Sequence, residues 1–164
     1  AHTLGLATSA TMMYGHVEQP RQRVDHLLAI RDLQARCPEG KPGFLAFIPW
    51  IFRSTGTRLE AEGTSTDFSP LEYIRIIAAS RLILNNIPNI QASWLTVGRQ
   101  TAQAALHSGA NDMGSIMIEE NVVSSAGAHN RFDAEGIRKA IREAGFTPRL
   151  RDQLYGMREY APQA

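Results

Sequence analysis

One stretch decides the fold: Leu6-Ala-Thr-Ser-Ala-Thr-Met-Met-Tyr-Gly-His-Val-Glu-Gln-Pro20. Within it, a residue pattern typical of a strand is followed by one typical of a helix. Residues 6–13 favour a strand, Gly15 marks a turn, and Pro20 suits the first turn of a helix. That helix should end near Cys37-Pro38, since the residue before a proline disfavours helix. The stretch therefore predicts a strand followed by a helix long enough to connect parallel neighbours.

The same alternation continues along the rest of the chain. A second strand is predicted at residues 43–48, stopped by Pro49 and followed by a long loop at residues 54–69. The other predicted elements are a helix at 70–86 capped by Ser69, a strand at 89–95, a helix at 98–109, a strand at 113–118 and a helix between Asp133 and Gly145. About four strand–helix units predict an α/β fold with parallel strands. The pattern alone allows either half of an eightfold barrel or an open doubly wound sheet.

Composition describes a chain of 164 residues and 18.1 kDa, the size of one domain spanning residues 1–164. The 17 Lys and Arg nearly balance the 16 Asp and Glu, so charge gives no reason to expect a nucleic-acid or membrane partner. No apolar run is long enough for a membrane span, and the start at Ala1 lacks both a signal pattern and an initiator Met. The single cysteine, Cys37, excludes an internal disulfide and favours a reducing, cytoplasmic compartment.

Candidate site residues follow the predicted strands, where parallel α/β proteins gather functional groups. After the first strand, Tyr14, His16 and Glu18 alternate, so an extended backbone would point all three to one side, while Gly15 permits close approach of a ligand. The alternative is that His16 and Glu18 cap the next helix and meet solvent. Trp50 and Trp94 would end the next two strands, as stacking surfaces for a planar ligand or as packing residues.

The most polar cluster lies at the two ends of the fourth predicted strand. Its candidates are Asn111, Asp112, Glu119, Glu120 and Asn121. A carboxylate held in a pocket could accept a proton or bind hydroxyl groups, whereas a solvated turn is the alternative interpretation. The five histidines show no metal-binding spacing, so no metal ligand is predicted. Residue types and spacing therefore indicate a pocketed α/β half-barrel and leave its reaction open.

Longer motifs carry a resemblance to a known family. They are Ala10-Thr-Met-Met-Tyr-Gly-His-Val-Glu18, Gly43-Phe-Leu-Ala-Phe-Ile-Pro-Trp50, Asn86-Ile-Pro-Asn-Ile-Gln-Ala-Ser-Trp94, Gly109-Ala-Asn-Asp-Met-Gly-Ser115, Glu119-Glu-Asn-Val-Val-Ser-Ser-Ala-Gly127 and the tail Arg151-Asp-Gln-Leu-Tyr155. Together they resemble the radical S-adenosylmethionine enzymes of the futalosine route to menaquinone. Within this group, the run Ile48-Pro-Trp50 and the Asn111-to-Asn121 region favour the cyclases that act on dehypoxanthine futalosine.

The resemblance implies a fold and two cofactors. The fold would be the carboxyl-terminal half of a TIM-type (β/α) barrel, and the complete enzyme would use S-adenosylmethionine and a [4Fe–4S] cluster with an external electron donor. The adenosyl group would lie near residues of the first strand and the turn after it: Thr11, Met12, Tyr14, Gly15, His16 and Glu18. The substrate dehypoxanthine futalosine would face Trp50, Trp94, Asn111, Glu120 and Asn121. Glu119, or else Asp112, would accept the proton that is lost when the aromatic ring is restored.

One departure from the family concerns the cluster. The Cys-x-x-x-Cys-x-x-Cys loop and the first four strands are not in this sequence, and Cys37 matches no cluster ligand. We therefore expect the chain to be a carboxyl-terminal half that is inactive alone and pairs with an amino-terminal half or with itself. Two alternatives remain. One is an aminofutalosine synthase or deazaflavin synthase relative, and the other is a cluster-free half-barrel that binds a nucleoside-like ligand.

Overall fold

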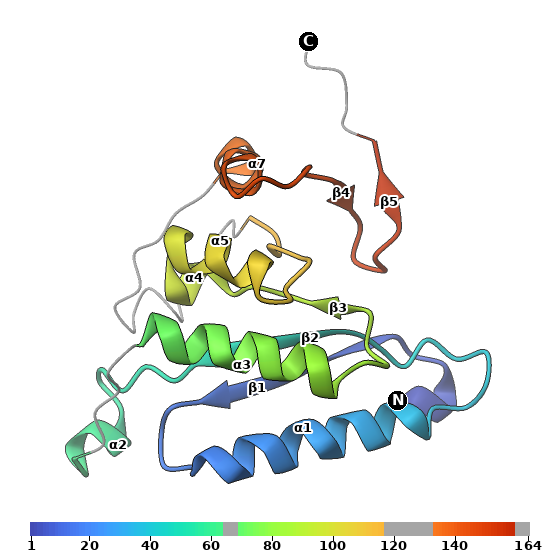
Figure 1. Ribbon diagram of the computed structural model, residues 1–164. Coiled ribbons are helices and arrows are strands. Elements are labelled where there is room, and N and C mark those ends of the chain that lie inside the picture. Colours follow the sequence, from blue (N-terminus) through green and yellow to red (C-terminus); the bar gives the residue numbers. More distant parts are fainter. Residues whose placement is uncertain (64–68, 117–132, 160–164) are drawn as a thin grey trace.

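The computed structural model describes residues 1–63, 69–116 and 133–159, and within them a parallel sheet has the order β1-β2-β3 (Figure 1). The strands are β1 (Thr8–Tyr14), β2 (Phe44–Ile51) and β3 (Asn89–Ile90). The larger helices are α1 (Pro20–Ala35), α3 (Pro70–Ile83), α5 (Arg99–His107) and α7 (Ala134–Glu143), and the short ones are η1 (His2–Leu4), α2 (Arg58–Ala61) and α4 (Trp94–Val97). The predicted mixed α/β fold with parallel strands is confirmed.

One face of the sheet is covered and the other is open. Alternate side chains of β1, including Met12 and Tyr14, lie in a core that α1 and α3 complete with Leu27 and Ile77. The side chains between them belong to the opposite face, which no described helix covers to the same degree. Because parallel strands pair in register, Met13 lies beside Trp50 on that open face, and their exposed fractions are 52% and 42%.

Helix capping explains why the predicted helices form where they do. Ser69 accepts a hydrogen bond from the Glu72 backbone N–H at 3.3 Å and begins α3, with Pro70 in the first turn. Asp133 accepts from the Gly136 N–H at 2.6 Å and begins α7. These start signals were correctly read from the sequence.

Two predictions around β2 were wrong. Pro49 does not stop the strand, which continues to Ile51. It lies two residues beyond Phe47, the last residue of β2 that pairs with β3, so its missing N–H interrupts no bond of that ladder. The loop predicted at 54–69 contains α2, because Thr57 accepts from the Glu60 N–H and closes one helical turn. Residues 64–68 lie outside the described part.

Two predicted strands also differ from the structure. The strand predicted at 89–95 ends at Ile90, because the Ser93 carbonyl accepts the N–H groups of Thr96 and Val97 and starts α4. No strand forms at 113–116, since Gly114 has a φ of +74° and its N–H bonds to the Asp112 carboxylate. A single parallel bridge between Gln91 and Asp112 marks the fourth strand position.

A two-stranded hairpin near the carboxyl end was not predicted. It joins β4 (Leu150–Arg151) to β5 (Met157–Arg158) in antiparallel pairing. Strands of two residues carry too little alternation to be recognised in a sequence. Among the described helices, none is long and apolar enough to cross a membrane.

Candidate functional site

The turn that follows β1 is closed by Glu18. Its carboxylate accepts the backbone N–H of Gly15 at 2.6 Å and that of His16 at 2.9 Å. Gly15 has a φ of +87°, which bends the chain sharply after Tyr14. The turn predicted at Gly15 is confirmed, so an extended backbone does not continue through residues 14–18, and the carboxylate folds back over the end of its own strand.

Arg23 connects this turn to two helices. Its Nε donates to Glu18 at 2.7 Å and its Nη1 donates to Glu72, so a residue of α1 bridges the turn and the first turn of α3. Burial raises the pKa of the Glu18 carboxyl, but the N–H groups of Gly15 and His16 and the guanidinium of Arg23 outweigh it and hold the pKa at about 2. Glu18 is an ionised, fixed acceptor near neutral pH.

Tyr14 and Met12 lie behind the turn, in the core. The Arg23 guanidinium sits 4.9 Å from the centre of the Tyr14 ring, and the buried Tyr14 hydroxyl has no hydrogen-bond partner among the described residues. Burial, followed by the charges of Tyr73 and Glu72, raises the pKa of Tyr14. The phenol therefore stays neutral and supports the turn from within the protein.

Thr11 and His16 are the more accessible of the cofactor candidates. Thr11 is exposed, and it precedes Met13 on the open face of the sheet. The His16 ring is partly exposed, with its Nδ1 3.3 Å from Glu18 and its edge against the ring of Phe52. The structure thus brings Gly15, His16 and Glu18 together at the carboxyl end of β1 and places Thr11 on the adjoining face.

The two tryptophans have different surroundings. Trp50 is 42% exposed on the open face, where a planar group could stack on it. Trp94 is only 4% exposed and belongs to the core at the start of α4. The adjoining Ser93 explains the difference, because its backbone N–H donates to the Tyr73 hydroxyl at 2.7 Å and its Oγ donates to the Pro49 carbonyl at 2.8 Å.

Asn111 lies at the edge of β3, where its side chain forms hydrogen bonds with backbone groups that a neighbouring strand would otherwise bind. Its Oδ1 accepts the Ile90 N–H and an Arg81 N–H, each at 2.9 Å, while its Nδ2 donates to the Pro88 carbonyl at 3.3 Å and to Asn89 at 3.2 Å. These bonds occupy both ends of the amide. The side chain orders the sheet edge next to Asp112.

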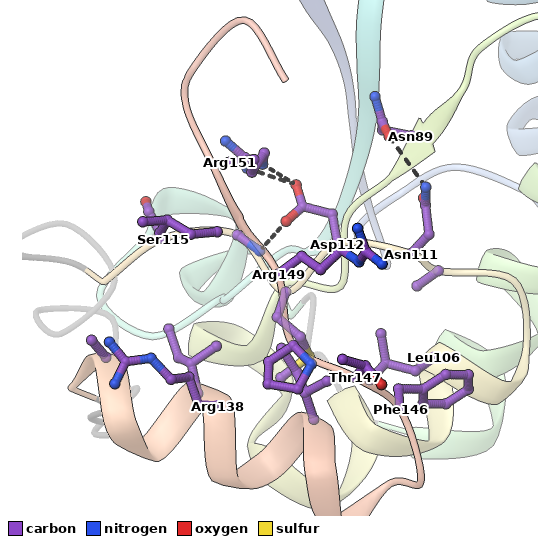
Figure 2. Close-up of a pocket in the computed structure, with 18 of the residues that line it drawn as sticks. Asn89, Leu106, Asn111, Asp112, Ser115, Arg138, Phe146, Thr147, Arg149 and Arg151 are labelled. Carbon is purple, nitrogen blue, oxygen red and sulfur yellow. Dashed lines mark hydrogen bonds and ion pairs between the residues drawn. The ribbon is translucent and has the colours of Figure 1, made fainter. Parts of the chain in front are cut away.

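Asp112 anchors the hairpin of the tail, as Figure 2 shows in part. Its Oδ2 accepts the Tyr155 hydroxyl at 2.7 Å and two N–H groups of Arg151 at 2.6 and 3.1 Å, and its Oδ1 accepts the Gly114 N–H at 2.8 Å. The Arg151 guanidinium also stacks 4.1 Å from the centre of the Tyr155 ring. Burial and then the Asp112 charge raise the pKa of Tyr155.

A cavity of about 470 Å³ opens beside this anchor, bounded by the 109–116 segment, α5, α7 and the tail (Figure 2). Its lining combines apolar and charged side chains. The apolar group is Leu106, Met113, Ile137, Ile141 and Phe146, and the charged group is Asp112, Arg138, Arg149 and Arg151. Asn111 and Asp112 are the sequence-predicted residues at this cavity, which lies apart from the Gly15–Glu18 turn in the sequence and in the sheet order.

Sequence reasoning did not identify several residues of these two clusters. Arg23 and Glu72 carry no local motif, because their contacts with Glu18 depend on how α1 and α3 pack. Arg151 and Tyr155 stood in the tail motif, which was a signal of importance without an assigned role. The predicted candidates Glu119, Glu120 and Asn121 lie outside the described residues.

The described donor groups do not form a metal site. In residues 1–63, 69–116 and 133–159, no group of three or more His, Cys, Asp or Glu side chains could hold a metal ion. Cys37 follows the end of α1 and its Sγ lies 3.7 Å from the Lys41 carbonyl oxygen, at the amino end of β2. An iron–sulfur cluster does not fit the donors of this part of the chain.

Known proteins resemble this chain over most of its length. Residues 41–164 match the family described as CofH/MqnC C-terminal region. The chain is 44% identical over 155 residues to cyclic dehypoxanthine futalosine synthase of Streptomyces coelicolor, covering 94% of this chain and 37% of that protein. It is 42% identical over 159 residues to a 5-amino-6-(D-ribitylamino)uracil–L-tyrosine 4-hydroxyphenyl transferase of Methanopyrus kandleri, covering 94% and 42%.

A second cyclic dehypoxanthine futalosine synthase, from Halalkalibacterium halodurans, is 40% identical over 152 residues, which are 93% of this chain and 39% of that protein. The chain thus spans about two fifths of the length of these relatives. These matches confirm the family resemblance that the sequence motifs indicated.

Proposed function

Because the chain belongs to the CofH/MqnC C-terminal region family, we propose that it is the carboxyl-terminal part of a radical S-adenosylmethionine cyclase that converts dehypoxanthine futalosine to its cyclic form in menaquinone biosynthesis. The observation that carries this proposal is the 44% identity over 94% of the chain to a cyclic dehypoxanthine futalosine synthase. The open sheet face supports it, since a barrel half should leave such a face toward the interior.

The cofactors divide between this chain and the remainder of the enzyme. The cluster ligands would come from elsewhere, because the described donors do not fit a cluster. For S-adenosylmethionine, the accessible polar groups of Thr11 and His16 stand beside a turn that Glu18 holds in place. We place the adenosyl group there, where its chemistry would be hydrogen abstraction. Met12 and Tyr14 lie in the core and would contribute by fixing the position of β1.

On the substrate side, we assign Trp50 to stacking and Glu119 to the role of proton acceptor. Asp112 is the weaker candidate, since its carboxylate already accepts four hydrogen bonds, three of them from Arg151 and Tyr155. These bonds occupy both oxygens of the carboxylate, so neither is free to approach a substrate proton. Glu120 and Asn121 remain candidates for binding the hydroxyl groups of the substrate.

A second function has comparable support. The 42% identity to a 5-amino-6-(D-ribitylamino)uracil–L-tyrosine 4-hydroxyphenyl transferase covers the same 94% of the chain. Both groups of relatives share the family, so the described residues are compatible with either reaction.

The test is an anaerobic assay of the longest open reading frame that contains this chain, with its cluster reconstituted. One reaction contains dehypoxanthine futalosine and the other contains 5-amino-6-(D-ribitylamino)uracil with L-tyrosine, and products are identified by mass spectrometry. We expect the cyclised product from the first reaction alone. Product from the second reaction alone would overturn the cyclase assignment in favour of the transferase.

The proton acceptor is tested in the same assay with two variants. Glu119→Gln should lose the cyclised product while it still binds the substrate. Asp112→Asn should retain product formation, although its tail is less firmly held. Unchanged product from Glu119→Gln would exclude Glu119 as the acceptor.

A further inference from the structure

The cavity beside Asp112 has the size and the lining of a small-molecule site. Its volume of about 470 Å³ lies within the range common for ligand pockets. Leu106 of α5, labelled in Figure 2, and Ile137 and Ile141 of α7 give it an apolar floor. Such a floor suits the flat or branched hydrocarbon part of a ligand, because burying that part against it is favourable.

The charged side chains on the cavity wall differ in whether they have an ion-pair partner. Asp112 and Arg151 neutralise each other at 2.6 Å, and Arg138 pairs with Glu135 of its own helix at 2.7 Å. Arg149 also lines the cavity, and it forms no ion pair with any described residue. Among the described residues of the wall, Arg149 is thus a cation without a carboxylate partner, next to an apolar floor.

The wall that carries Arg149 is held in position before any ligand binds. Pro148 precedes Arg149, and Arg151 two residues later is fixed to Asp112 by two hydrogen bonds. Tyr155 adds a third bond to the same carboxylate. Because these bonds hold the segment around Arg149 in place, its cation loses less conformational freedom when a ligand binds than a cation on a free loop would lose.

We propose that this cavity binds a small carboxylic acid with an apolar body, its carboxylate paired with Arg149 and its hydrocarbon part against Leu106, Ile137 and Ile141. Arg149 and the apolar floor line the same cavity. Only a ligand that has both a carboxylate and an apolar part can therefore make both contacts. The inference rests on the cavity itself and is independent of which reaction the complete enzyme performs.

The probes are 2-naphthoate and its uncharged analogue 2-naphthamide, titrated into the whole chain by calorimetry. We expect naphthoate to bind with a Kd on the order of 0.1–1 mM, and naphthamide about tenfold more weakly. Methyl resonances of Ile137 and Ile141 should shift on addition of naphthoate, which locates the probe in the cavity. Because binding is measured without turnover, its failure is separate from failure of the cyclase proposal.

Three variants complete the test. Arg149→Met should weaken naphthoate binding about tenfold, and Arg149→Lys should retain most of the affinity. Lys139→Met is the matched control, since Lys139 is an exposed cation of α7 that does not line the cavity, and its affinity should be unchanged. Equal affinity for acid and amide, native affinity in Arg149→Met, or no detectable naphthoate binding would each overturn the proposal.

Discussion

Two carboxylates, Glu18 and Asp112, each fold back to accept a backbone N–H of a nearby glycine and also bind an arginine, from the following helix for Glu18 and from the tail for Asp112. Glu18 joins Gly15 to Arg23, and Asp112 joins Gly114 to Arg151. These donors compensate the negative charge of each partly buried carboxylate. At the scale of single residues, these two side chains decide where the turn after β1 and the tail lie.

The anchoring role of Asp112 leads to a prediction for Asp112→Asn. An amide cannot form the same charged bonds with Arg151, so the free energy of unfolding should fall by about 2 kcal/mol. Removing the negative charge should also lower the pKa of Tyr155, which that charge raises in addition to burial. Urea unfolding and phenolate absorbance across a pH titration measure the two effects. If the Tyr155 titration were unchanged, the anchoring contact would be contradicted.

A pH dependence follows from Glu18. Its pKa is about 2 in the folded chain, against the ordinary value of 4.5, so folding gains stability from this group above pH 4.5. That gain is lost as the pH falls from about 4.5 toward about 2. We expect it to amount to roughly 2 kcal/mol after solvent screening.

The measurement compares the native chain with Glu18→Gln, by urea unfolding at several acidic pH values. The native chain should lose stability over that interval more steeply than the variant. Parallel curves for the two proteins would show that Glu18 is not the responsible group. Glu39→Gln serves as a control for the removal of a carboxylate outside this cluster.

At the scale of elements, Arg81 connects α3 to the edge of the sheet. Its guanidinium donates to the carbonyls of Gly109 and Pro88 and to the Asn111 side chain. Asn111 in turn accepts the Ile90 N–H. An arginine and an asparagine therefore hold the edge of β3, where only one parallel bridge continues the sheet.

Gly109→Ala tests this arrangement. Gly109 has a φ of +121°, and an added Cβ would lie 2.7 Å from the Cβ of Arg81. Both the strain and the displacement of Arg81 act against folding, so we expect a loss of about 2 kcal/mol in urea unfolding. Gly40→Ala is the control, because Gly40 also has a positive φ, of +73°, but nothing lies within 4 Å of its added Cβ. Equal losses for the two variants would contradict a role for the Arg81 contact.

The elements differ in how well a sequence can predict them. Two helix starts were predicted correctly, from Ser69 with Pro70 and from Asp133. Their signals are local, because each cap depends on a few neighbouring residues. The edge of β3 depends on Asn111, whose bond with the Ile90 N–H joins residues 21 positions apart, and the described residues 113–116 form no strand because of the bend at Gly114. Local patterns therefore overestimated the lengths of these two strands.

At the scale of the whole molecule, the sheet separates a packed face from an open one. Met12 and Tyr14 are buried against α1 and α3, while Met13 and Trp50 face solvent side by side. An apolar surface of this kind on a parallel sheet is unusual, since such sheets are normally covered on both faces. The sequence placed Thr11 and Trp50 near a site, but it could not show which of the neighbouring candidates, such as Met12, point into the core.

The open face predicts binding of an uncharged apolar dye. Nile red fluorescence should increase with the native chain, and Met13→Lys should reduce the increase by roughly half, because it places a charge on the exposed face. Leu82→Lys is the matched control, since Leu82 is 80% exposed on α3, away from that face. An equal reduction in both variants would contradict a dye site on the open face.

The position of Cys37 makes the chain convenient for site-specific labelling. It is the only thiol in the sequence, it is partly accessible, and it lies at the amino end of β2, whereas the Gly15–Glu18 turn lies at the carboxyl end of the adjacent strand. A maleimide fluorophore attached there would need no cysteine removed elsewhere. Energy transfer from Trp50 and Trp94 to that fluorophore would report on the folding of the sheet while leaving both candidate ligand regions unmodified.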